Sequence, residues 1–160
     1  MVNIAKPDDY IIYTDADREN KGPFIASNNK IKKLLDTQNI VVFPMGFLEG
    51  NWTKRDSFVL MGMDSDPEVK FSGQITAAMI IVKNTFKAQR FIGEWLTYMQ
   101  DPRTSTDDEN TFGLANDPGF KDHRHDQSVL SLLTKKWKLE LQGLMGDWHN
   151  YLVKNKYGRK

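Results

Sequence analysis

The sequence predicts an α/β fold in which a mixed, mostly parallel sheet is flanked by helices. Three short apolar runs rich in β-branched and aromatic residues are typical of buried strands. Amphipathic stretches with apolar residues at three-and-four spacing alternate with these runs, which is the pattern of an α/β sheet. The 160 residues contain no internal repeat and no linker. We therefore expect one domain over residues 1–160.

The three predicted strands are residues 10–13 (YIIY), 39–45 (NIVVFPM) and 74–82 (QITAAMIIV). Each run is too short for a typical helix and carries the residue types that fit a half-buried or buried pleated surface. The third is apolar almost without a break at its far end, so it is predicted to be fully buried there.

Two short helices are predicted around the second strand. One runs to Asp36 after a cap at Asn28 or Asn29. The other covers residues 54–62, with Thr53 as its N-cap and a glycine at its end.

The clearest predicted helix covers residues 86–100, because its apolar residues recur at helical spacing. Residues 101–122 follow as a long loop rich in Asp, Pro, Gly and Asn. A loop of that length in a small domain is usually functional or disordered. A last helix is predicted to start near Asp126.

Composition excludes several kinds of site and partner. The absence of cysteine removes disulfides, thiol catalysis and thiolate metal sites. Positive and negative residues are interspersed and the net charge is +1, which argues against a nucleic acid partner. No stretch reads as a secretory signal or as a membrane span. We therefore expect a soluble, cytoplasmic protein.

Two aspartates, Asp15 and Asp17, stand where the first strand ends. Side chains alternate along an extended chain, so both carboxylates point to the same side. Such a pair suits a hard divalent cation, Mn²⁺ or Mg²⁺, and the carboxyl end of a strand is where α/β sheets bind ligands. The alternative is a solvated turn in which Asp17 caps nearby backbone.

A second polar group occupies residues 122–133, DHRHDQSVLSLL, where the long loop becomes a helix. Asp126 and Gln127 fall in the first helical turn, where the helix dipole favours a carboxylate. The alternative is that Asp126 only caps the helix while His123 and His125 are solvated.

The order of these motifs resembles the glycosyltransferases of the GT-A fold, in which an Asp-x-Asp motif is followed by an Asp-Gln motif that opens a helix. Glycogenin-like enzymes are one such group. The likeness is closer to small transferases of viruses, algae and bacteria that carry WTKRDxF and PGFxxHRHDQS. In this chain those motifs are residues 52–58 and 118–128, and the likeness runs from about residue 8 to residue 137.

The resemblance implies an enzyme that moves a sugar from a nucleotide-diphosphate sugar donor to a hydroxyl acceptor, such as a carbohydrate. It implies that Asp15 and Asp17 hold Mn²⁺ or Mg²⁺. Members of such families often supply a late histidine as a third metal ligand, for which His149 is the candidate; the alternative is that this tail is a partly buried aromatic-rich segment. Asp126 and Gln127 are the implied catalytic residues. Asp126 serves either as base on the acceptor hydroxyl or as the group that stabilises an oxocarbenium-like centre.

Four further residues are candidates for binding the substrate by the same resemblance: Arg55, Gln74, Arg124 and His125. For two of them the residues allow a simpler interpretation. Arg55 would then be a surface charge on a helix, and Gln74 a residue at a strand edge.

The chain departs from the family pattern before Asp15, because only fourteen residues precede it. In the family a nucleotide-binding half of one or two βαβ units, about 30 residues or more each, comes first. We therefore expect the C-terminal part of the fold: the chain is truncated, another chain supplies the missing part, or activity has been lost. Self-association or modest stability is expected to follow. An unpaired strand edge would favour such a homo-oligomer.

Two other functions stay open. One is a catalytically inactive, transferase-derived binding or assembly module. The other is a phosphatase of the haloacid-dehalogenase type, in which Asp15 is the nucleophile and Asp17 the acid or base. That family continues with Gly-Thr or Gly-Val, whereas this chain has Arg18–Glu19.

Overall fold

The computed structural model describes residues 5–15 and 29–141. The three predicted strands and four predicted helices are all present, and three short helices add to them. In chain order the elements are β1 (Tyr10–Thr14), α2 (Asn29–Thr37), β2 (Ile40–Leu48), α3 (Glu49–Trp52), α4 (Arg55–Leu60), α5 (Pro67–Phe71), β3 (Gly73–Lys83), α6 (Phe86–Met99), α7 (Pro102–Ser105) and α8 (His125–Lys136). Within this part of the chain, no helix has the length and apolar character needed to cross a bilayer.

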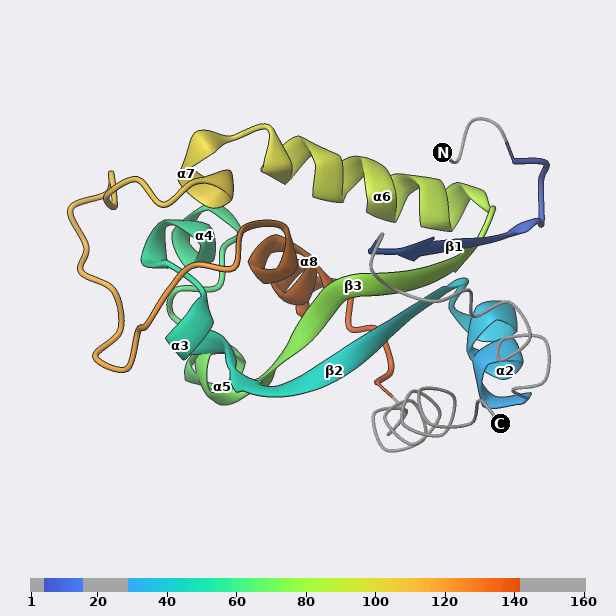
Figure 1. Cartoon of the computed structure of the whole chain (residues 1–160), viewed down its shortest axis with the longest axis horizontal. Helices are drawn as coiled ribbons and strands as arrows, with labels where there is room; N and C mark the ends of the chain where they lie inside the picture. Colours follow the sequence, from blue (N-terminus) through green and yellow to red (C-terminus); the bar gives the residue numbers. More distant parts are fainter. Residues whose placement is uncertain (1–4, 16–28, 142–160) are drawn as a thin grey trace, which may run out of the picture.

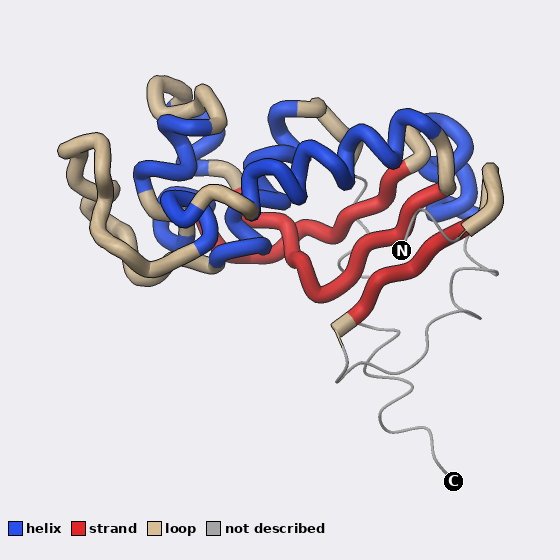
Figure 2. Tube along the Cα trace, turned by 90° about the horizontal axis from the view of Figure 1, so that it is seen from above, coloured by secondary structure: helices blue, strands red, loops and turns tan. Residues whose placement is uncertain are grey.

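The prediction of a mostly parallel sheet is wrong. In the described part of the chain the strands lie side by side in the order β1-β3-β2, and both pairs are antiparallel (Figure 2). The short helices α3, α4 and α5 gather at one end of the sheet, so the chain turns back there and β3 runs beside β2 in the opposite direction (Figure 1). No crossover helix separates the two strands, and a parallel pair requires one.

Helices cover both faces of this small sheet. α6 and α8 pack on one face, and α2 packs on the other (Figure 1). Side chains of β3 alternate between the two cores: Ile80 and Val82 face α6 and α8, whereas Met79 and Ile81 face α2. A strand buried on both faces needs a continuous apolar run, which explains the pattern of residues 74–82.

The pairing of β2 with β3 is irregular near the end that carries the short helices. The register shifts on either side of Phe43–Pro44, where the proline has no N–H to donate. A Cβ on Gly73 would lie 2.9 Å from the carbonyl oxygen of Met45, so only glycine allows this close approach. The arrangement brings the next residue, Gln74, against α3.

The long loop before α8 is held by the WTKRD motif. The Lys54 ammonium donates to two loop carbonyls, at 3.1 and 2.9 Å. The backbone N–H of Arg55 donates to a loop asparagine at 2.8 Å, and the buried Asp56 carboxylate accepts from the backbone N–H of Thr111 at 2.7 Å. Residues 106–124 thus have a fixed path from α7 to the start of α8, although they contain no regular element.

Candidate functional site

The end of β1 presents two polar side chains to the sheet face that α6 and α8 cover. Ile11 packs into that core, and side-chain alternation places Tyr13 and Asp15 on the same side. The Tyr13 hydroxyl donates to the Asp15 carboxylate across 3.4 Å. Within the described residues that carboxylate accepts no other hydrogen bond and is exposed, so its oxygen atoms are accessible to a ligand.

Asp126 lies in the first turn of α8, as the sequence predicted. Its carboxylate accepts from the backbone N–H of Gln127 at 2.8 Å and is exposed. The indole N–H of Trp95 on α6 donates to the Asp126 carbonyl at 3.2 Å and fixes this end of the helix. The positive end of the helix dipole stabilises the carboxylate.

Tyr13 is influenced by the carboxylates at both the end of β1 and the start of α8. Partial burial raises the pKa of the Tyr13 phenol, and the negative charges of Asp15 and Asp126 raise it further. Two carboxylates far apart in the sequence therefore act on one hydroxyl. The end of β1 and the start of α8 therefore lie within electrostatic range of each other.

The donor atoms of this site suit a hard divalent cation. Asp15, Tyr13 and Asp126 offer only oxygen, which Mg²⁺ and Mn²⁺ prefer. The other two predicted metal ligands, Asp17 and His149, lie outside the described residues. Among residues 5–15 and 29–141, no three histidine or acidic side chains are grouped as a complete metal site. Of the three predicted metal ligands, Asp15 is the one that the structure describes.

The structure joins two of the other predicted site residues directly. The side-chain amide of Gln127 donates to the Gln74 carbonyl oxygen at 2.9 Å. Gln74 is fully buried, and its own amide group faces α3. Gln74 thus lies behind Gln127 rather than at the surface.

Arg124 lies on an aromatic platform formed by Phe47 and Trp52. The guanidinium carbon is 4.3 Å from the centre of the Trp52 ring, and the Lys121 ammonium lies 5.6 Å from the same ring. Neither cation has an acidic partner among the residues that the structure describes, and Arg124 Nε is buried without an acceptor. Two cations stacked on an aromatic surface without a carboxylate favour an anionic ligand.

The two histidines before α8 differ in environment. His123 is buried: its Nδ1 accepts the backbone N–H of Lys54 at 3.3 Å, and its Nε2 lies 2.8 Å from the Thr104 carbonyl. Burial lowers its pKa to about 4. His125 is partly exposed, has a φ of 41° and lies 2.9 Å from Asp107. The alternative in which both histidines are solvated therefore fails for His123.

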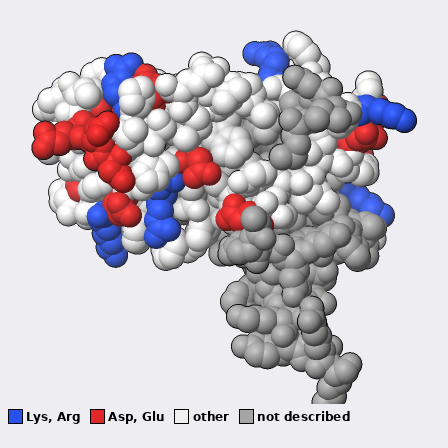
Figure 3. All heavy atoms as spheres, turned by 45° about the horizontal axis from the view of Figure 1, so that its top comes forward, with Lys and Arg blue, Asp and Glu red and all other residues white. Residues whose placement is uncertain are grey.

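The loop that carries Asp107 has further acidic residues at positions 108 and 109. Acidic side chains gather at this end of the molecule (Figure 3). His125 faces that acidic end through its contact with Asp107.

Arg55 forms a bidentate ion pair with Asp64, with distances of 2.9 and 3.0 Å. The guanidinium hydrogen bonds lower the pKa of the Asp64 carboxyl. A third bond joins Arg55 to the Ala115 carbonyl. In this structure Arg55 thus connects α4, the turn after it and the loop.

A pocket of about 320 Å³ lies beside α3 and α5, and none of the predicted site residues lines it. Lys70 in this pocket pairs with Asp64 and Asp117 at 3.1 and 3.2 Å, so its charge is already neutralised. The lining residues are Leu48, Gly50, Asn51, Lys70, Phe71, Asp117, Pro118 and Gly119.

Sequence reasoning missed the buried polar group behind Gln74. Glu49 is fully buried at the start of α3, and Ser131 and Lys135 of α8 donate to it. Thr53 also donates to Glu49, at 2.6 Å; the prediction of Thr53 as N-cap of α4 is wrong, because Lys54 occupies that position. A signal existed: Ser131 and Lys135 are spaced i, i+4 and so lie on one face of the predicted helix.

Comparisons of the chain with protein families, with curated proteins and with solved structures found no match.

Proposed function

We propose that this protein is a divalent-metal-dependent glycosyltransferase of the GT-A type, which transfers a sugar from a nucleotide-diphosphate donor to a hydroxyl acceptor. One observation supports the proposal: the Tyr13 hydroxyl donates to the Asp15 carboxylate after β1, and the Asp126 charge at the start of α8 lies close enough to raise the pKa of the same phenol. The proposed reaction requires the Asp-x-Asp segment, of which the structure describes Asp15, to lie near the Asp-Gln segment. The same helix end also carries Arg124.

Each residue has a distinct task in this reaction. Asp15 would hold the cation, and a bound divalent cation would supply positive charge to stabilise the leaving diphosphate. Asp126 is next to the reacting centre, where its carboxylate either accepts the proton of the acceptor hydroxyl or stabilises positive charge on the sugar ring. Arg124 and Lys121, both stacked on Trp52, attract the phosphate groups.

A screen of nucleotide sugars with Mn²⁺ tests the proposal, with release of the nucleoside diphosphate as the readout. We expect Asp15→Asn and Asp126→Asn to lower kcat/KM by about 100-fold or more, because each removes a charge that acts in the transition state. In calorimetry Asp15→Asn should also abolish Mn²⁺-dependent binding of the nucleoside diphosphate, whereas Asp126→Asn should retain it.

Asp8→Asn is a matched control for these two variants. Asp8 is an exposed aspartate before the other end of β1, and asparagine tolerates its positive φ. Its turnover should equal that of the wild type. Equal turnover by the wild type and all three variants would contradict the assignment of Asp15 and Asp126.

Arg124→Gln and Lys121→Gln should each weaken binding of the Mn²⁺–nucleoside diphosphate complex by about tenfold, since a charge-assisted contact to phosphate is lost. The wild-type affinity should fall as salt is added, and this dependence should be shallower in both variants. Lys87→Gln on the exposed side of α6 is the control, and calorimetry is the measurement. Unchanged affinity in both site variants would remove Arg124 from the site.

A further inference from the structure

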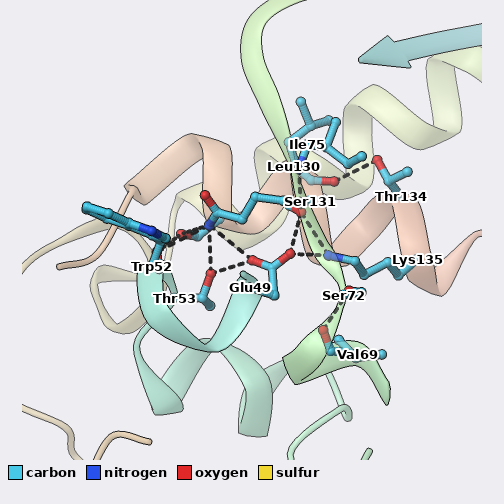
Figure 4. Close-up of polar contacts among 12 residues, drawn as sticks. Glu49, Trp52, Thr53, Val69, Ser72, Ile75, Leu130, Ser131, Thr134 and Lys135 are labelled. Carbon is cyan, nitrogen blue, oxygen red and sulfur yellow. Dashed lines mark hydrogen bonds and ion pairs between the residues drawn. The ribbon is translucent and has the colours of Figure 1, made fainter. Parts of the chain in front are cut away.

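A buried carboxylate organises the polar residues behind α8. Glu49 is fully buried, and Figure 4 shows it between Thr53, Ser131 and Lys135. Thr53 donates to one of its oxygens at 2.6 Å, and the amide of Gln74 donates to the same oxygen at 3.1 Å. Ser131 and Lys135 donate to the other oxygen. Every neighbour is a donor, so Glu49 acts only as an acceptor.

This arrangement leaves one orientation for the Gln74 amide. Its nitrogen must face the Glu49 carboxylate and the Trp52 carbonyl, at 3.1 and 3.3 Å, because both are acceptors. The reversed amide would place its oxygen against a carboxylate in a buried site, which is costly. The Gln74 carbonyl oxygen must therefore point away from Glu49.

The orientation of Gln74 in turn fixes the orientation of Gln127, which lies nearer the surface. The Gln74 oxygen needs a donor and receives the Gln127 amide nitrogen at 2.9 Å. The Gln127 oxygen Oε1 is then directed away from Gln74, and in the described part of the chain no group donates to it. Gln127 is only half-buried and follows the exposed Asp126.

We propose that Glu49 is a positioning residue: through Gln74 it fixes the amide of Gln127 so that the Gln127 carbonyl oxygen accepts a hydrogen bond from a hydroxyl group of the ligand. The exposed Asp126 carboxylate also offers an acceptor, so this side of the site selects ligands rich in hydroxyl donors. The identification of that hydroxyl with one on the donor sugar rests on the proposed function. Gln74, being fully buried, acts through Gln127 and does not touch the ligand.

The first test needs no ligand and uses hydrogen exchange of the Gln127 side-chain amide, followed by NMR in the full-length chain. In Glu49→Gln the Gln74 amide loses its charged acceptor and keeps the neutral Trp52 carbonyl, so its orientation is held more weakly and Gln127 exchange should accelerate roughly tenfold, as for loss of one hydrogen bond. The control is Asp56→Asn, which also neutralises a fully buried carboxylate but one bonded to the loop. Wild-type exchange at Gln127 in a folded Glu49→Gln would overturn the proposal.

The second test uses monodeoxy versions of whichever nucleotide sugar the wild type turns over. Removal of one particular sugar hydroxyl should lower kcat/KM by about tenfold, and Gln127→Ala should abolish this penalty. We expect the penalty to fall below about twofold in Glu49→Gln and in Gln74→Met, with Gln127 itself intact, and to persist in Asp56→Asn.

The two tests separate this proposal from the proposed function. Gln74→Met keeps Glu49 and Lys135 paired, so it remains informative if Glu49→Gln does not fold. A full penalty in Gln74→Met would overturn the positioning role even though turnover occurs. If no nucleotide sugar is turned over, the proposed function fails, while the exchange experiment still decides whether Glu49 holds Gln127.

Discussion

Lys135→Met should lower the free energy of unfolding by about 3–5 kcal/mol, because it leaves the carboxylate of Glu49 buried without a positive partner. The Glu49 side chain has no exposed surface, and that of Lys135 is 13% exposed. Burial lowers the pKa of Lys135, and the Glu49 charge opposes that shift. The Glu49 charge therefore stabilises the charged form of Lys135, and removal of one member of the pair destabilises the folded protein.

Urea denaturation followed by circular dichroism measures this loss. The matched control is Lys136→Met, which removes the neighbouring lysine on the same helix. Lys136 pairs with Glu94 and its side chain is 39% exposed, so the loss should be at most about 1 kcal/mol. Similar losses in the two variants would mean that Glu49 is compensated by Thr53 and Ser131 without a charge.

The stability of the protein should fall steeply as the pH drops from about 6.5 to about 4, because of His123. Lys54 donates to Nδ1 of this ring, so the proton of the neutral imidazole sits on Nε2 and faces the Thr104 carbonyl. A second proton on Nδ1 would point at the Lys54 N–H. The folded protein therefore disfavours the charged ring.

The sign follows from proton binding. Between the folded pKa of about 4 and the unfolded value of 6.5, the unfolded chain binds a proton at His123 that the folded chain does not. The contribution of His123 to the free energy of unfolding is fully present above pH 6.5. It decreases as the pH falls, by up to about 3 kcal/mol at pH 4.

Urea unfolding at several pH values checks this dependence in the wild type and in His123→Gln. Glutamine can accept from Lys54 and donate to Thr104, but it does not titrate, so the dependence in this window should flatten. His125→Asn is the control, since that side chain is 43% exposed, and its curve should keep the wild-type slope. A wild-type slope in His123→Gln would assign the dependence to another group.

Local pattern predicted the elements well, whereas strand direction depended on contacts across the sheet. The helix over residues 86–100 and the strand over residues 74–82 were found within one residue of their predicted ends, because periodicity marks them. The apolar run of β3 is typical of parallel sheets, yet here α2 on one face and α6 and α8 on the other bury an antiparallel strand equally well.

The candidate site was predictable only in part. The acidic residues Asp15 and Asp126 stood out by their positions at the ends of elements, and the structure brings them near one tyrosine. The contact between Gln74 and Gln127 depends on how α8 packs against β3, which no local pattern encodes. Lys54 and Asp56 fasten the loop, and their residue types alone do not distinguish an anchor from a ligand.

The left-handed backbone at His125 limits which residues can replace this histidine. Asparagine or glycine enters that conformation readily, whereas valine or isoleucine does not. A β-branched replacement would relax by rotating the chain where the loop meets α8, and Asp126 and Gln127 would swing with it. Substitutions at position 125 should therefore be ranked by the geometry of their main chain before the chemistry of the imidazole is considered.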